Sequence, residues 1–161
     1  VPLGTGIAFA NKYLNKKTLT FCFFGDGAVN QGQVYEAFNM AALWQLPIVY
    51  IIENNQYGMG TSVERASAMT ELFRRGESFG IKGYEIDGMD PLSVHLCMKK
   101  IYQQVLNEIK GPILIEAKTY RYRGHSMSDP GKYRTRQEIQ ETRENRDPIE
   151  RVRTFLIENN F

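Results

Sequence analysis

The chain has 161 residues, of which 42% are hydrophobic, and this length and composition suit one domain with a proper core. Its formal net charge of +2 is too small to indicate, by itself, a nucleic acid or a membrane surface as the partner. No apolar run approaches membrane-spanning length, and Cys22 and Cys97 lie within apolar stretches, so we expect buried thiols of a reducing compartment rather than a disulfide.

Apolar periodicity divides the chain into alternating helices and strands. In chain order we expect a helix over 6–14, a strand over 18–24, a helix over 31–44, a strand over 47–52, a Gly- and Asn-rich loop over 53–65, a short helix near 68–75, a strand over 83–87, a helix over 91–109 and a strand over 112–120. A basic loop over 121–134 and two charged helices broken at Asp147–Pro148 follow. The chain has no initiator Met and both ends interrupt helical patterns, so we expect residues 1–161 to be one domain of a longer protein, truncated at both ends.

This alternation predicts an α/β fold with a mostly parallel sheet and helices on both faces. The predicted strands are apolar throughout rather than alternating, as strands covered on both faces are. In such sheets, ligands bind beyond the carboxyl ends of the strands. The turn after 18–24, the loop after 47–52 and the basic loop after 112–120 therefore belong to one edge of the sheet.

Two polar motifs on that edge indicate a bound cation. Asp26 lies between two glycines after the first strand, and Asn55 follows the second. Each motif alone is an ordinary turn sequence, and that interpretation stays open. Together, a carboxylate, an amide oxygen and a loop carbonyl are ligands that Mg²⁺ accepts, and glycines before a helix N-terminus favour a diphosphate. A Walker-type nucleotide loop is set aside because "GDGAVNQG" lacks the Lys-Ser/Thr pair.

The motifs "GDGAVNQGQ" (25–33) and "ENNQYGMGTS" (53–62) resemble the two ends of the thiamine diphosphate motif. With "GPILIEAKTYRYRGHSMSDP" (111–130), the chain is similar over its whole length to alpha-type subunits of the thiamine diphosphate-dependent 2-oxoacid dehydrogenase family. The resemblance implies the thiamine diphosphate-binding fold, and specifically its diphosphate-binding domain.

Carried over by position, the resemblance implies that Mg²⁺ is bound by the Asp26 carboxylate, the Asn55 amide oxygen and the Tyr57 carbonyl. It places the main chain of Gly27 and Ala28 at the diphosphate. His125, the loop histidine, is expected near the diphosphate and the reacting centre, as a cofactor contact and catalytic residue; an imidazole that titrates near neutrality suits proton transfer.

The family also implies partners. The glutamate that activates the cofactor belongs to a beta subunit, so this chain alone is not expected to be catalytically competent. The working unit resembles an α2β2 heterotetramer docked on a lipoyl-bearing dihydrolipoyl acetyltransferase core, in a bacterial cytoplasm or, alternatively, a mitochondrial matrix.

By analogy with the family, Asp26 and the sequence Met59-Gly60-Thr61 resemble the members that act on pyruvate, which implies oxidative decarboxylation of pyruvate with acetyl transfer to lipoyl groups as the reaction. Branched-chain 2-oxoacid or acetoin dehydrogenase alpha subunits are the alternatives. A non-catalytic fragment that binds Mg-diphosphate or the beta chain is the alternative from a different class.

The basic loop carries six Lys or Arg residues between 118 and 136, interleaved with tyrosines. Three interpretations stay open: a lid over the cofactor, a solvated surface segment, or a single-stranded nucleic-acid binder, of which the first fits the position best. Ser126 matches a serine that is phosphorylated in mitochondrial relatives, so it is a possible regulatory site, although Lys132 stands where those relatives have a second serine. His95 and Glu53 carry weaker expectations: His95 is a packing or surface residue, and Glu53 either orients the Asn54–Asn55 turn or is simply exposed.

Overall fold

A computed structural model describes residues 1–107 and 111–161 of the chain. Its centre is a four-stranded sheet in the order β1-β2-β6-β5, formed by β1 (Thr20–Gly25), β2 (Ile48–Asn54), β6 (Ile113–Lys118) and β5 (Lys82–Asp87). Every neighbouring pair in this sheet is parallel. The predicted parallel α/β sheet is confirmed, because each strand lies where the apolar runs placed it.

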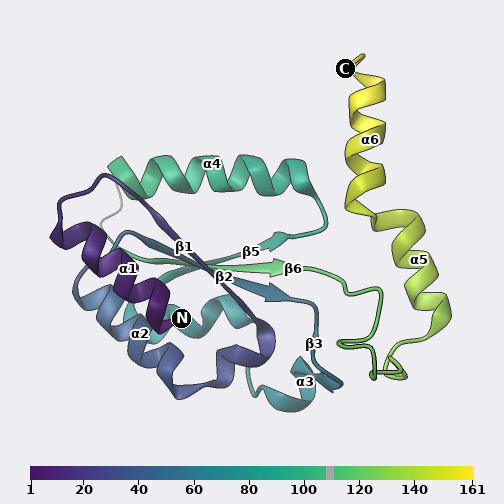
Figure 1. Ribbon diagram of the computed structural model, residues 1–161, viewed down its shortest axis with the longest axis horizontal. Coiled ribbons are helices and arrows are strands. Elements are labelled where there is room, and N and C mark those ends of the chain that lie inside the picture. The colour runs from purple at the N-terminus through teal and green to yellow at the C-terminus, as the bar shows by residue number, and fades with distance from the viewer. Residues whose placement is uncertain (108–110) are drawn as a thin grey trace.

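Helices cover both faces of the sheet, as predicted. The helices α1 (Pro2–Tyr13) and α2 (Gly32–Leu43) pack on one face, and α4 (Pro91–Asn107) packs on the other (Figure 1). Side chains of β2 alternate between these two cores, because successive residues of a strand point to opposite faces. Tyr50 and Ile52 lie in the core with α1 and α2, while Val49 and Ile51 lie in the core with α4. The end of the predicted 91–109 helix lies outside the described residues.

The prediction that β1 is covered on both faces is wrong. Cys22 and Phe24 point into the core with α1 and α2, but Phe21 and Phe23 on the opposite face are 40% and 60% exposed. These two residues are in register with Val49 and Ile51 of β2, where α4 packs. The described part of α4 covers β2 and β6 and leaves the outer part of that face, on the edge strand, open.

The short helix expected near 68–75 is also different in the structure. A one-turn helix, α3 (Val63–Ala66), precedes the position, and a 3₁₀ segment, η2 (Leu72–Phe79), begins later and runs further. The main-chain N–H of Phe73, in the first turn of η2, donates to the side chain of Glu116. Gly80, in the left-handed conformation with φ of 70°, ends the segment. These tertiary and terminal contacts were not visible in the periodicity.

The remaining elements gather at the carboxyl edge of the sheet (Figure 1). After β1 comes the 3₁₀ helix η1 (Asp26–Asn30), and after β2 comes a small hairpin of β3 (Tyr57–Gly58) and β4 (Thr61–Ser62). The loop after β6 leads to α5 (Arg136–Arg146) and α6 (Pro148–Glu158). Asp147 caps α6 by accepting from two main-chain N–H groups, which confirms the predicted break before Pro148.

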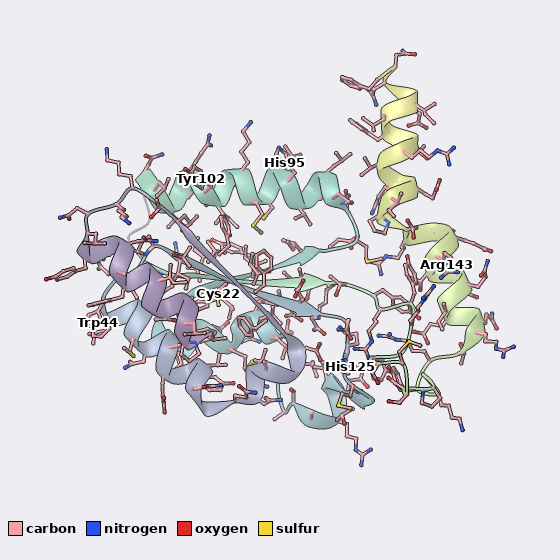
Figure 2. The ribbon with its side chains drawn as sticks, viewed as in Figure 1. Cys22, Trp44, His95, Tyr102, His125 and Arg143 are labelled. Atoms are coloured by element: carbon pink, nitrogen blue, oxygen red, sulfur yellow. The ribbon has the colours of Figure 1, made fainter. Side chains whose placement is uncertain are left out.

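Both cysteines are free thiols, as expected; Cys22 is buried and Cys97 is half-buried. His95 lies exposed on α4 (Figure 2), in agreement with its surface interpretation. Among the described residues, no helix is both long and apolar enough to span a membrane.

Candidate functional site

The turn after β1 buries a carboxylate. Asp26 is the first residue of η1 and is 4% exposed. Burial raises the pKa of the Asp26 carboxyl above its ordinary value of 3.8, while main-chain N–H groups of Asp26 and Asn55 and the charges of Arg121 and Arg134 act against this rise. Because burial disfavours the ionised form, a cation bound at this carboxylate would be strongly favoured.

The segment that follows Asp26 differs in one respect from the expectation. The five residues of η1 come first, and the α-helix α2 begins only at Gly32, so no long helix starts directly at Gly27. Gly27 is exposed at this edge, and Ala28 packs partly against the core. The assignment of their main-chain groups to a diphosphate stays a prediction.

The loop after β2 is shaped by two successive asparagines. The Asn54 side-chain oxygen accepts from the Gln56 N–H at 2.8 Å, and the Asn55 side-chain oxygen accepts from the Tyr57 N–H at 3.3 Å. Gln56 has a φ of 73°, a conformation that L-residues other than Gly, Asn and Asp rarely adopt. These contacts turn the chain sharply into the β3–β4 hairpin. They also fix the Asn55 side chain against the main chain of Tyr57.

The two turns lie against each other, as the parallel sheet predicted. A Cβ added at Gly27 would stand 3.5 Å from the Gly58 Cα, and the Asn55 N–H is one of the groups that act on the Asp26 carboxylate. A cavity of about 230 Å³ lies between them, lined by Asp26, Gly27, Asn30 and Gly58 together with α3 and its flanking residues. The Asp26 carboxylate and the main chain of Asn55 therefore lie together at the carboxyl edge of the sheet.

The donor set suits a hard cation and not a soft one. Among the described residues there is no cluster of three or more His, Cys, Asp or Glu side chains that could hold a metal. A cation at this edge would instead have one carboxylate, one amide oxygen and a main-chain carbonyl, which are ligands typical of Mg²⁺ when phosphate oxygens and water complete the octahedron. The buried Asp26 carboxylate beside a cavity fits a Mg²⁺ ion with its phosphate oxygens.

The basic loop docks on the same edge. Arg134 is buried, donates to the Asn55 carbonyl oxygen at 2.6 Å, and lies over the rings of Tyr57 and Tyr120 at 4.7 and 4.5 Å from their centroids. Arg121 donates to the Tyr57 carbonyl at 3.4 Å and to the Met59 carbonyl at 2.8 Å. The 121–134 loop thus holds the 54–60 loop from the outside, so it is not a freely solvated surface segment.

His125 lies further out on this loop (Figure 2), and both it and the next residue, Ser126, are exposed. The His125 Nδ1 is 3.5 Å from the Arg121 Nη1, and its main-chain N–H donates to Asp129 at 2.7 Å. Since an arginine can only donate, the His125 Nδ1 can take part in this contact only as an acceptor. One guanidinium therefore connects His125 to the Tyr57 carbonyl, and Ser126 contacts Ser128 at 3.0 Å.

Two residues that support the site were not predicted from the sequence. Arg134 was counted only as one charge of the basic loop. Glu116 lies in the apolar strand β6 and is completely buried, where it accepts from the Asn54 side chain at 2.5 Å. A glutamate inside an otherwise apolar strand is itself a signal, because a buried charge needs partners. Glu53, the residue considered for orienting the loop, is exposed.

The fold and this edge define an α/β protein with a polar site at the carboxyl ends of a parallel sheet. The whole chain, residues 1–161, matches the family described as Dehydrogenase E1 component, and the chain belongs to that family.

Within curated proteins, the chain is similar to E1 component alpha subunits of pyruvate dehydrogenase. It is 58% identical over 161 residues to the subunit of Rickettsia bellii, covering 100% of this chain and 49% of that protein. It is 55% identical to the subunit of Rhizobium meliloti, with 100% and 46% covered, and 55% identical over 159 residues to the mitochondrial subunit of Schizosaccharomyces pombe, with 98% and 38% covered. The chain therefore spans about half the length, or less, of these relatives.

Among solved structures, a mutant transketolase from Pichia stipitis is similar, with a TM-score of 0.58 and 21% sequence identity, over 72% of this chain and 18% of that one. This similarity shows a shared fold and nothing further. It confirms the α/β architecture independently of the sequence motifs.

Proposed function

We propose that this chain carries the magnesium and diphosphate half of a thiamine diphosphate site in the alpha subunit of a pyruvate dehydrogenase E1 component. The activity is the oxidative decarboxylation of pyruvate with reductive acetylation of lipoyl groups. The relatives named above, at 55–58% identity over nearly the whole chain, support pyruvate over a branched-chain 2-oxoacid or acetoin.

One observation carries the proposal: the buried Asp26 carboxylate lines a cavity at the carboxyl edge of the sheet and accepts from the main-chain N–H of Asn55, which belongs to a different crossover connection. A turn that only reverses the chain has no need of a buried carboxylate whose ionisation is disfavoured. The Asp26 carboxylate, the Asn55 amide oxygen and the Tyr57 carbonyl are the proposed Mg²⁺ ligands. The main-chain N–H groups of Gly27 and Ala28 are the proposed diphosphate donors.

When bound, thiamine diphosphate supplies the electron sink that decarboxylation of a 2-oxoacid requires. The residues of this chain bind and orient it. Arg121 and Arg134 hold the 54–60 loop in place and lower the local negative potential. His125, on the docked loop, is the proposed hydrogen-bond donor to an oxyanion.

Catalysis in this proposal needs a beta subunit and, for acetyl transfer, a lipoyl-bearing dihydrolipoyl acetyltransferase. Location in a bacterial cytoplasm, with a mitochondrial matrix as the alternative, stays a prediction.

Calorimetry tests the proposal on the full alpha subunit assembled with its beta partner. We expect thiamine diphosphate to bind tightly with Mg²⁺ and much more weakly in the presence of EDTA, and the loaded complex to turn over pyruvate in preference to 2-oxoisovalerate and acetoin. Thiamine diphosphate binding that does not depend on Mg²⁺ would rule out the proposed magnesium site. Cofactor binding without turnover of any of the three substrates would instead support the alternative of a non-catalytic Mg-diphosphate-binding module.

A further inference from the structure

A buried glutamate lies next to the proposed metal site and is not part of the proposed ligand set. Glu116 is fully buried in β6 and is in register with Ile52 of β2, so its side chain lies on the same face as Asn54, two residues further along β2. Its Oε1 accepts from the Asn54 Nδ2 at 2.5 Å and from the Lys118 Nζ at 2.6 Å. Its Oε2 accepts from the Phe73 N–H at 2.9 Å.

The three partners of this carboxyl group are all donors, and one of them is the Lys118 ammonium. Lys118 compensates the charge and also reaches Glu85 at 3.5 Å. A buried charge is tolerated only when it is paired and hydrogen-bonded, and Glu116 meets both conditions. The network therefore joins three elements: β2 through Asn54, η2 through Phe73, and β6 itself.

The carboxylate determines which way the Asn54 amide faces. An asparagine has a donor side and an acceptor side, and a carboxylate can only accept, so Nδ2 must point toward Glu116. The Asn54 oxygen is then directed to the Gln56 N–H, which it binds at 2.8 Å. Gln56 has the unfavourable φ of 73°, and a conformation of this kind persists only where surrounding contacts enforce it.

Gln56 lies between the two proposed ligands of the loop, Asn55 and Tyr57. The backbone turn at Gln56 sets the direction of the Asn55 side chain relative to the Tyr57 carbonyl. Outer groups that orient metal ligands in this way affect metal affinity by about 10–100-fold. Glu116 thus acts on the metal through Asn54 and Gln56, without touching it.

We propose that Glu116 is a positioning residue for the divalent cation: through the Asn54 amide it holds the 54–60 loop in the conformation that presents the Asn55 oxygen and the Tyr57 carbonyl to the metal. This inference rests on the proposed function, because it assumes that a cation binds at Asp26 and Asn55. It adds a residue that affects metal affinity without being one of the proposed metal ligands.

Glu116→Gln is the direct test, because it keeps the shape and replaces one acceptor by a donor. Whichever way the new amide faces, its NH₂ group meets either Asn54 and Lys118 or the Phe73 N–H. In the full alpha/beta complex, saturated with thiamine diphosphate, we expect the dissociation constant of Mn²⁺, measured by electron paramagnetic resonance, to rise by about 10–100-fold. The Michaelis constant for pyruvate at saturating Mn²⁺ should change little.

The matched control is Glu53→Gln. Glu53 precedes Asn54 on the same strand and is exposed. Its replacement by glutamine removes the same charge but none of the hydrogen bonds of Glu116. We expect its Mn²⁺ affinity to stay within about twofold of wild type, a far smaller change than the loss of an outer-shell partner brings. An equal loss in both variants would show that the field of nearby charges, and not loop positioning, is responsible, and would overturn the inference.

A purely structural role has a different signature. It would lower the thermal unfolding temperature of Glu116→Gln and leave the Mn²⁺ affinity of the folded complex unchanged, which would also overturn the inference. If Glu116→Gln does not assemble, the same Mn²⁺ measurement is made on Asn54→Ala. This variant removes the Asn54–Glu116 hydrogen bond and leaves Glu116 with Lys118 and Phe73, so an unchanged Mn²⁺ affinity would overturn the inference. Absence of Mn²⁺-dependent cofactor binding in the wild type would instead reject the proposed function, so the two failures are distinguishable.

Discussion

The guanidinium of Arg134 donates a hydrogen bond of 2.6 Å to the carbonyl oxygen of Asn55, although 79 positions separate them in the sequence. The same group lies between the rings of Tyr57 and Tyr120. This contact makes one unit of two loops that leave different strands at the same edge of the sheet.

Arg134→Lys should release the basic loop. Lysine keeps the charge but loses the planar fork that stacks between two rings and donates to two carbonyls. Because a hydrogen bond from a charged group contributes about 1.5–3 kcal/mol, we expect amide exchange over 121–134 to become at least about tenfold faster. Hydrogen exchange with mass spectrometry measures this, and Arg136→Lys, at an exposed position beside it, is the control. Equal exchange rates in the two variants would contradict the role of Arg134 in holding the two loops together.

Asp26→Asn should abolish metal-dependent binding and stabilise the metal-free protein. Burial raises the Asp26 pKa, so the ionised group costs free energy in the folded state once the pH exceeds its ordinary value of 3.8. A neutral asparagine removes this cost at pH 7. If Asp26 is the proposed metal ligand, its loss should also weaken Mg²⁺-dependent cofactor binding by more than the roughly 100-fold upper range for an outer partner. Thermal unfolding without metal and calorimetry with it measure the two effects. An unfolding temperature lower than that of wild type would argue against the buried charge.

The outer part of the basic loop should loosen in acid. Asp129 accepts from the N–H groups of His125 and Gly131 and from the Tyr133 hydroxyl, and these bonds lower its pKa to about 2. A lowered carboxyl pKa stabilises the folded loop fully above the ordinary value of 3.8, and this contribution is lost as the pH falls toward about 2.

The His125 and Gly131 amide resonances should therefore titrate together with a midpoint near the value of about 2 given for Asp129. The amide of Val49, buried in β2, reports in the same spectra whether the sheet has unfolded. A midpoint at or above 3.8 would mean that these hydrogen bonds do not form in solution.

A negative charge at Ser126 should disturb the cofactor side of the loop. The residue is exposed and directly follows His125, and a phosphate would add about −1.5 to −2 charges beside the proposed anionic cofactor. We expect Ser126→Glu in the complete alpha/beta complex to lose most of its activity with pyruvate, while Ser126→Ala, which removes the hydroxyl without adding charge, stays close to wild type. Near-normal turnover of Ser126→Glu would remove the lid assignment of this loop.

Much of the site was predictable because its geometry follows from topology. Parallel strands end at one edge, so residues directly after β1, β2 and β6 had to lie near one another, and the Asp26 carboxylate does meet the Asn55 main chain. The break at Asp147 was predictable for a local reason, since a capping carboxylate before a proline needs no distant partner.

The predictions failed where distant contacts decide the structure. The η2 segment was expected to be an ordinary short helix, but the Phe73 N–H is bound by Glu116, 43 positions away. The outer face of β1 was expected to be covered, but coverage depends on where α4 packs and not on the composition of the strand.

The sequence by itself determined the order of strands and helices, the edge on which the polar turns gather, and the family, because hydrophobic period and short motifs are local properties. Only the tertiary structure decided that Glu116, and not Glu53, holds the Asn54 amide, and that Arg134 is buried between two tyrosines. Each of these depends on which donor meets which acceptor across strands and loops far apart in the chain, and such pairings leave no periodic trace in the sequence.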